Sequence, residues 1–273
     1  MKFLIKFFKW FAIILVSIIV LMYIFNVDYL LRAVRTIYFK GYTTAFLEDY
    51  KEFPNREIKK GIAQPWAIAS DYNSVPATQN LQNTHKELQT IAYLIIKNDS
   101  IWHESYFDGF DKNSKTNSFS MAKSVVTMAM GKAIMEGKMK SLDQKVTDFF
   151  PELKGKYAKE VTIGDLSSMA SGLSWDEKYY SPFSIVTRAY FDDNLNDVIL
   201  GLDIKEKPGQ SFKYLSGATQ LLAMCIEKAT GEHLSDYVSK HFWQPMGAEN
   251  EALWQLDEAP DGIEKAYCCI ASN

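Results

Sequence analysis

The chain has 273 residues, of which 47% are hydrophobic and 23% charged, and its formal net charge is -3. This length and composition allow a substantial buried core and exclude a disordered protein, and the charge provides no basic face for nucleic acid. The three cysteines are too few and too badly spaced for a disulfide framework or a CxxC zinc site. Cys225 lies in an apolar helical run, where we expect it to be buried as a small hydrophobic residue.

The N-terminus differs in composition from the rest of the chain. Lys2, Lys6 and Lys9 precede residues 10–25, the uncharged run WFAIILVSIIVLMYIF. The run has almost no polar face, which is typical of a membrane span or an export signal and not of a soluble core helix. Because no small-x-small cleavage site follows, we expect residues 1–28 to be an uncleaved membrane anchor. The lysines should stay in the cytoplasm, which places the rest of the chain on the extracytoplasmic side, periplasmic or extracellular.

The next segment, residues 29–85, lacks a sustained hydrophobic period and contains three prolines. We expect a juxtamembrane helix there, followed by an irregular lead-in. A hairpin is predicted next, with strands at 90–96 and 101–107 joined by a short Asn-Asp-Ser turn. Ser118 can cap a helix that runs over residues 119–136, because apolar positions recur along it and a glycine follows.

The remainder of the chain is rich in predicted helices. They are expected at 163–169 after a capping Thr162, at 192–200, at 218–229 after a capping Ser216, and at 233–242. Because the only clear hairpin precedes them, the pattern predicts an α+β arrangement in which a helical region is inserted after the first strands. Residues 86–273 are expected to form one domain.

Ser120 and Lys123 are spaced as a nucleophile and its base at the start of the predicted helix 119–136. Free amides and the helix dipole in a first turn favour negative charge, including an alkoxide forming on the Ser120 hydroxyl. Lys123 lies on the same face, and desolvation in a cleft can lower the pKa of its amine until the neutral form accepts the serine proton. The alternative is a surface lysine after a capping serine, since the pair alone is close to chance expectation for this composition.

The surrounding residues resemble the serine β-lactamase and penicillin-binding-protein superfamily. Residues 118–125 (SFSMAKSV) resemble its active-site helix, and residues 212–218 (FKYLSGA) resemble its second motif. Tyr214-Leu215-Ser216 and the Tyr-Cys-Cys run at 267–269 are most similar to the 6-aminohexanoate-dimer hydrolase and esterase-type members of the class C β-lactamase-like branch. The resemblance covers roughly residues 88–273. It implies a β-lactamase/transpeptidase-like α+β fold, with an antiparallel sheet and a helical region.

The resemblance also implies roles for individual residues. Tyr214 would be a general acid/base that relays the proton of Ser120 to the leaving group, with Lys123 beside its phenol; the alternative is a packed tyrosine before a helix. Ser216 and Trp175 are predicted to contact the substrate, and for Trp175 the alternative is a packed indole in a solvated turn. The four histidines are scattered without metal-ligand spacing, so neither a metal site nor a cofactor is predicted.

One part of the superfamily pattern has no counterpart in the sequence. The third motif, Lys-Thr-Gly or His-x-Gly on a late strand, lines the cleft and its strand supplies the second oxyanion-hole amide. Nothing after Tyr214 matches it, and residues 228–231 (KATG) are expected to be a helix terminus. The chain is therefore expected to be a C-terminally truncated member of the superfamily whose closing strands are absent.

The leading hypothesis is a membrane-anchored serine hydrolase that cleaves an amide or ester bond of a small or peptide-like substrate through an acyl-serine intermediate. The second hypothesis is a catalytically impaired envelope binding or sensor protein of the penicillin-binding type. The missing third motif favours the second hypothesis, whereas the presence of Ser120, Lys123 and Tyr214 favours the first. A third possibility is a degraded gene product that barely folds.

Overall fold

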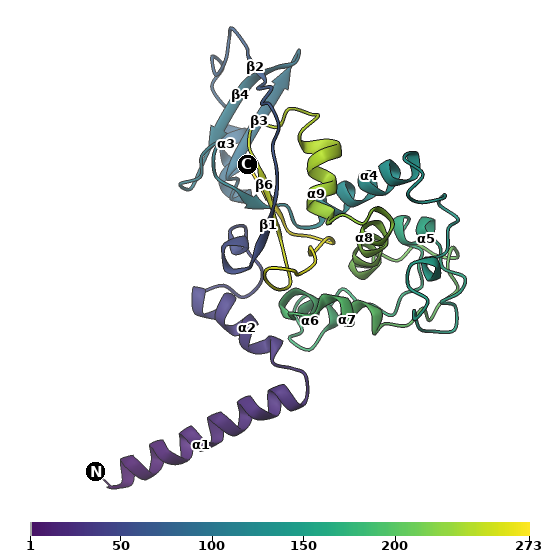
Figure 1. Ribbon diagram of the computed structural model, residues 1–273. Helices are drawn as coiled ribbons and strands as arrows, with labels where there is room; N and C mark the ends of the chain where they lie inside the picture. Colours follow the sequence, from purple (N-terminus) through teal and green to yellow (C-terminus); the bar gives the residue numbers. More distant parts are fainter. Residues whose placement is uncertain (1) are drawn as a thin grey trace.

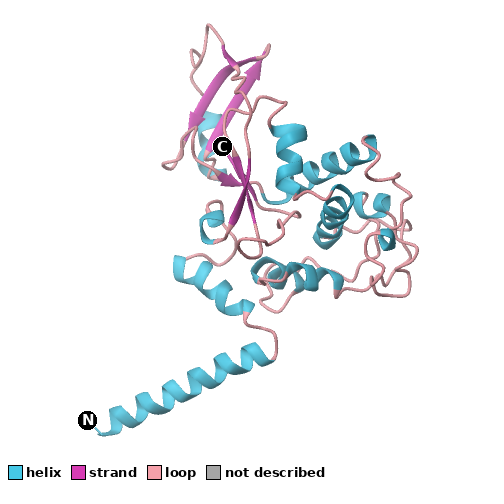
Figure 2. Cartoon of the chain, viewed as in Figure 1, coloured by secondary structure: helices cyan, strands magenta, loops and turns pink. Residues whose placement is uncertain are grey.

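The computed structural model describes residues 2–273 and consists of a projecting N-terminal helix, a layer of strands and a region of packed helices (Figure 1). Figure 2 shows that the strands gather in one part of the molecule and that most of the helices lie beside them. This arrangement confirms the predicted α+β class.

Helix α1 (Lys2–Ile24) is the projecting element, and none of its residues is buried. It has 23 residues, its most apolar 18-residue stretch has a mean hydropathy of 2.4, and by length and composition it can cross a membrane. The helix contains the predicted apolar run 10–25 except for its last residue.

Helix α2 (Tyr29–Thr36) follows directly and is the predicted juxtamembrane helix. Its buried residues, Tyr29, Ala33 and Thr36, recur at the spacing of one helical face. This face packs against α6 (Ile185–Phe191), and the Tyr29 hydroxyl donates a hydrogen bond to the Pro182 carbonyl at 3.0 Å. Helix α2 is therefore part of the folded body.

The strands form two sheets. The larger sheet is antiparallel and has the order β1 (Asn55–Ile58), β6 (Ala252–Gln255), β7 (Ile270–Ser272) and β5 (Thr116–Asn117). The smaller sheet has the order β2 (Ala67–Ile68), β4 (Ser100–Tyr106) and β3 (Ala92–Lys97). β3 and β4 are the predicted hairpin, and Asn98 and Asp99 in its turn both have positive φ, as a two-residue type I′ turn requires. The β2–β4 pair is parallel, unlike the antiparallel sheet expected.

The lead-in segment contributes more structure than its sequence indicates. Strand β1 pairs with β6, so that Arg56 lies opposite Trp254 and Ile58 opposite Ala252. Helix α3 (Gln79–Leu88), capped by the Thr78 side chain, begins in this segment and continues past residue 85. The division at residue 85/86 stays a prediction, but part of the lead-in lies in the main sheet.

The helical region surrounds α8 (Ser216–Thr230), in which every residue from 216 to 226 is buried, including Cys225 as expected. Around it pack α4 (Ala122–Met135), α5 (Ile163–Ser167), α7 (Leu195–Leu200) and α9 (Leu234–Val238). Shorter helices occupy Tyr38–Lys40, Asp49–Glu52, Phe119–Met121 and Val146–Asp148, and a π-helical turn occupies Ser239–Trp243. A helix buried on all sides makes α8 the centre of the core.

Most predicted helix starts are confirmed within a few residues. Thr162 caps α5 in a reciprocal capping box with Asp165. Helix α7 begins after Asn194 and not at Asp192 as predicted. The Asn194 side chain caps it by accepting a hydrogen bond from the Asp197 amide. Ser216 is the first residue of α8 and makes no cap. Helix α6 was not predicted.

Gly172 marks a close crossing of two chain segments. Its φ is +69°, and an added Cβ would lie 2.1 Å from the carbonyl oxygen of Glu206. We expect Gly172→Ala to lower the free energy of unfolding by about 3 kcal/mol or more, because backbone strain and a backbone collision combine. Gly137→Ala is the matched control: its φ is +70° but a Cβ there meets no atom within 4 Å.

The control should cost only about 1 kcal/mol, the strain of a left-handed alanine. Urea denaturation in detergent, followed by tryptophan fluorescence, measures both variants. Equal losses in the two would show that the crossing at Gly172 contributes nothing beyond its backbone angle.

Candidate active site

Ser120 lies in the short helix Phe119–Met121 that leads directly into α4, and its side chain is exposed. The residue before it, Phe119, has a φ of +47°, which is unusual for a residue with a side chain. The Phe119 amide donates to the side-chain oxygen of Asn117 at 2.9 Å, and the Ser118 amide donates to the Ile270 carbonyl of β7 at 2.7 Å. These bonds hold the turn that presents Ser120.

The predicted capping role of Ser118 is wrong. Its backbone is helical (φ -75°, ψ -11°), whereas a capping side chain normally projects from an extended residue. Its hydroxyl makes no hydrogen bond within the described chain. Instead, the Asn117 side-chain oxygen accepts a hydrogen bond from the Phe119 amide at the start of the helix.

A buried polar network supports this turn from behind. The Asp49 carboxylate is fully buried and accepts hydrogen bonds from Asn117 Nδ2 at 3.0 Å, Gln255 Nε2 at 3.0 Å and the Tyr190 hydroxyl at 2.6 Å. Burial raises the pKa of Asp49, and these hydrogen bonds oppose the rise. The network joins residues from four separate elements, so no local sequence pattern could have predicted it.

Lys123 occupies the buried side of α4. Its Nζ donates to Ser120 Oγ at 3.0 Å and to the Tyr267 carbonyl at 2.6 Å, and the residue is 8% exposed. Burial lowers the pKa of the Lys123 amine, while Tyr214 and Glu177 partly offset this effect. The burial excludes the surface-lysine alternative and leaves an amine within proton-transfer distance of a serine hydroxyl.

Tyr214 is brought to the same place from the loop before α8. Lys123 Nζ lies 5.1 Å from the centroid of the Tyr214 ring. The tyrosine is 41% exposed, so its phenol is accessible to solvent or to a substrate. The structure thus brings Ser120, Lys123 and Tyr214 together, as the sequence predicted for a catalytic group. Their roles in catalysis stay predictions.

Glu177 organises the two predicted substrate contacts. Its carboxylate accepts hydrogen bonds from the Trp175 indole at 2.9 Å, from the Ser216 hydroxyl at 3.2 Å, and from the Ser216 amide and the Tyr179 hydroxyl. Trp175 is 7% exposed and packs against Gly217, which favours the packed-indole alternative. Ser216 is buried but borders a cavity at Ser120. Substrate contact by either residue stays a prediction.

That cavity, of about 480 Å³, opens beside Ser120. Phe119, Tyr267 and Cys268 line it, together with Ala33 of α2 and residues of α6. Cys268 forms a disulfide with the neighbouring Cys269, which the sparse cysteines did not predict.

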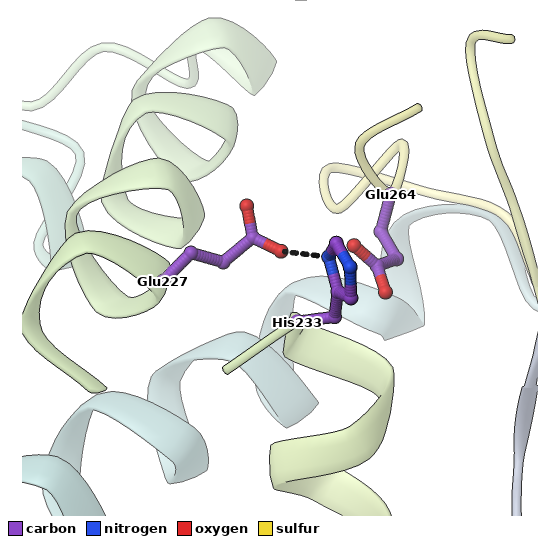
Figure 3. Close-up of side chains that lie close together, drawn as sticks. All are labelled: Glu227, His233 and Glu264. Carbon is purple, nitrogen blue, oxygen red and sulfur yellow. Dashed lines mark ion pairs between the residues drawn. The ribbon is translucent and has the colours of Figure 1, made fainter. Parts of the chain in front are cut away.

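A second cluster of titratable groups lies away from this site (Figure 3). Glu227, His233 and Glu264 approach one another within 4.8 Å, a spacing at which metal ligands occur. However, Arg56 lies 2.8 Å from Glu264, and burial and the neighbouring Glu264 raise the pKa of Glu227 to about 8. Glu264 is paired with Arg56, while Glu227 accepts a hydrogen bond from the Leu234 amide at 2.9 Å and lies 3.8 Å from His233 Nδ1. Both carboxyl groups thus have partners within the chain, so we assign this cluster a structural role.

The fold and the Ser-x-x-Lys helix define the class of protein. Helices packed beside an antiparallel sheet, with the serine at the start of a helix and the lysine one turn later, are the β-lactamase/transpeptidase-like arrangement. Residues 77–267 match the family model described as Beta-lactamase, and the chain belongs to this family.

The chain is also similar in sequence to two curated proteins. The chain is 25% identical over 194 residues to a 6-aminohexanoate-dimer hydrolase of Paenarthrobacter ureafaciens, which covers 67% of this chain and 49% of the relative. It is 26% identical over 192 residues to protein flp of Staphylococcus aureus strain MW2, with coverages of 65% and 37%. The chain thus spans half or less of the length of these relatives.

Solved structures agree on the fold. A Bacillus anthracis protein assigned as a 6-aminohexanoate-dimer hydrolase superposes with a TM-score of 0.65 at 20% identity, covering 81% of this chain and 63% of that one. The octameric penicillin-binding protein homologue from Pyrococcus abyssi superposes with a TM-score of 0.55 at 19% identity, covering 71% and 52%. Both show that the β-lactamase/transpeptidase-like fold was predicted correctly.

Proposed function

We propose that this protein is a membrane-anchored serine hydrolase that cleaves an amide or ester bond through an acyl intermediate on Ser120. The observation that carries the proposal is the 3.0 Å contact between the Lys123 amine and Ser120 Oγ, with the lysine buried and its pKa lowered. A neutral amine at this distance can remove the serine proton, and a strained, fixed turn presents the hydroxyl.

The proposed reaction has two halves. The Ser120 hydroxyl passes its proton to Lys123 as Oγ attacks the carbonyl carbon, and the Ser120 amide donates to the oxyanion that forms. Collapse breaks the bond to the amine or alcohol, which receives the proton through Tyr214. A water molecule then attacks the acyl carbon and gives a proton to the Lys123–Tyr214 pair. The bond between the acyl carbon and Ser120 Oγ breaks, the carboxylic acid leaves, and the pair returns a proton to Oγ. These steps use no cofactor.

The family supports hydrolysis as the reaction class, and the name of the Paenarthrobacter relative specifies an amide oligomer as the substrate of that protein. The anchoring part of the proposal depends on α1, which has no buried residue and is apolar enough to span a bilayer. Lysines 2, 6 and 9 would hold its start in the cytoplasm, leaving the site on the extracytoplasmic side.

A fluorophosphonate probe tests the proposal. We expect covalent labelling of the 273-residue chain in detergent micelles, with the label on Ser120 by peptide mapping, and none in Ser120→Ala. The variant Ser124→Ala, one turn along the same helix, is the control and should label as the parent does. A folded chain without Ser120-dependent labelling would overturn the proposal. A label without turnover of any ester or amide would favour the binding or sensor protein.

A further inference from the structure

We infer that the cavity beside Ser120 is the acyl pocket of the proposed hydrolase and that it selects neutral, apolar acyl groups, with the juxtamembrane segment 33–45 as one of its walls. This inference rests on the proposed function and specifies its substrate class. The observations that carry it are the composition of the cavity, its place relative to the proton-transfer residues, and the elements that enclose it.

The cavity is uncharged. Its volume of about 480 Å³ lies within the range of roughly 300–1,000 Å³ that is usual for small-molecule sites. Among the described residues that line it, none carries a charged side chain, and Ala33, Ile37, Val186 and Phe191 supply apolar surface. A carboxylate placed there would lose its hydration without gaining a cation, whereas an alkyl or aryl group would gain from burial.

The position of the cavity assigns it to the acyl side of the substrate. Ser120 borders the cavity, but neither Lys123 nor Tyr214 is among its lining residues. The leaving group must depart toward the residue that protonates it, which is the Tyr214 side of Ser120. The acyl group therefore extends to the other side, into the cavity.

The juxtamembrane segment encloses this space from one side. Ala33 and Ile37 are buried at the end of α2, while Tyr38, Thr44 and Ala45 continue the wall after the helix. Helix α6, against which α2 packs, supplies further lining residues. The segment next to the proposed anchor is thus also a specificity element, which its sequence did not indicate.

A series of p-nitrophenyl esters tests the inference. Acylation is measured as the Ser120-dependent release of p-nitrophenolate from the acetate, butyrate, hexanoate and octanoate esters. We expect kcat/KM to rise by up to about fourfold per added methylene until the cavity is filled, which is the fold-change that corresponds to about 0.8 kcal/mol. The hemisuccinate ester, close to butyrate in size but anionic, should react at least tenfold more slowly than butyrate.

A charge placed in the wall provides a gain-of-function test. Thr44 is exposed and lines the cavity, so Thr44→Lys adds an ammonium without disturbing the core. We expect the ratio of hemisuccinate to butyrate kcat/KM to rise at least about fivefold, the effect of roughly 1 kcal/mol between opposite charges 4 Å apart in water. Thr84→Lys, an exposed threonine on α3, adds the same charge outside the cavity and should leave the ratio unchanged.

The outcomes separate this inference from the proposed function. Ser120-dependent release that is independent of chain length, or that is fastest with hemisuccinate, overturns the acyl pocket and leaves the hydrolase intact. An unchanged ratio in Thr44→Lys overturns the assignment of segment 33–45 as its wall. No Ser120-dependent release from any ester counts against the proposed function itself.

Discussion

Replacing Lys123 by alanine is expected to slow acylation of Ser120 by about a thousandfold, within the range of 10²–10⁴ that a general base contributes. The reason is the hydrogen bond of 3.0 Å between Lys123 Nζ and Ser120 Oγ, which has no substitute once the amine is removed. Lys132→Ala is the matched control on the same helix, since Lys132 is partly exposed and forms an ion pair with Glu136 at 3.1 Å. The measurement is the rate of fluorophosphonate labelling.

The pH dependence of labelling gives a second, independent readout. Burial lowers the pKa of Lys123 below the ordinary lysine value of about 10.4, and only the neutral amine can accept a proton. The labelling rate should therefore rise with pH and reach its plateau below that value. In Lys123→Ala the residual rate should lose this step.

Two results would contradict the assigned role of Lys123. One is a Lys123→Ala variant that labels at the parent rate. The other is a variant that labels slowly but keeps the same pH step, since the titrating base would then be another group. A loss of labelling that accompanies a loss of folding is recognised by circular dichroism, and Lys123→Met, which keeps the aliphatic stem, then supplies the folded variant.

The features predicted correctly from the sequence are those that depend on neighbouring residues. In the hairpin β3–β4, the alternation of apolar and polar residues and the turn all lie within 15 residues, from Ala92 to Tyr106. The apolar run of α1, the capping role of Thr162 and the Ser120–Lys123 spacing are equally local. Such patterns depend on residues close in sequence, so they can be recognised without knowing the tertiary contacts.

The missed features depend on residues far apart in the sequence. Strand β1 has four residues and no alternation of its own, and only its pairing with β6 makes it a strand. Asp49 and Gln255 meet behind the Ser120 turn although 205 positions lie between them, because the hydrogen bond spans a separation of 206 residues. The wall contributed by Ala33 and Ile37 also appears only when α2 packs on α6. Sequence reasoning brought Ser120, Lys123 and Tyr214 together as candidates but did not predict the distant residues that surround them.

The hydrogen-bond network behind the Ser120 turn depends on one residue, Asp49. We expect Asp49→Ala to lower the free energy of unfolding by about 4 kcal/mol. The carboxylate is fully buried, and its loss leaves the Asn117, Tyr190 and Gln255 donors without an acceptor, each at a cost of roughly 1–3 kcal/mol. Asp143→Ala is the control, because Asp143 is exposed and a surface change of this kind normally stays within about 0.5 kcal/mol.

The same substitution should also affect the chemistry. Asn117 holds Phe119 in its left-handed conformation, and Asp49 in turn holds Asn117. Strain of roughly 1–3 kcal/mol at Phe119 persists only while its neighbours fix the turn. Under conditions where Asp49→Ala remains folded, Ser120 labelling should therefore fall by at least about tenfold, although Asp49 contacts neither Ser120 nor Lys123 in the described chain. Urea denaturation and labelling measured on one preparation separate the two effects. Parent-like labelling in a destabilised variant would show that the network stabilises the fold without positioning the nucleophile.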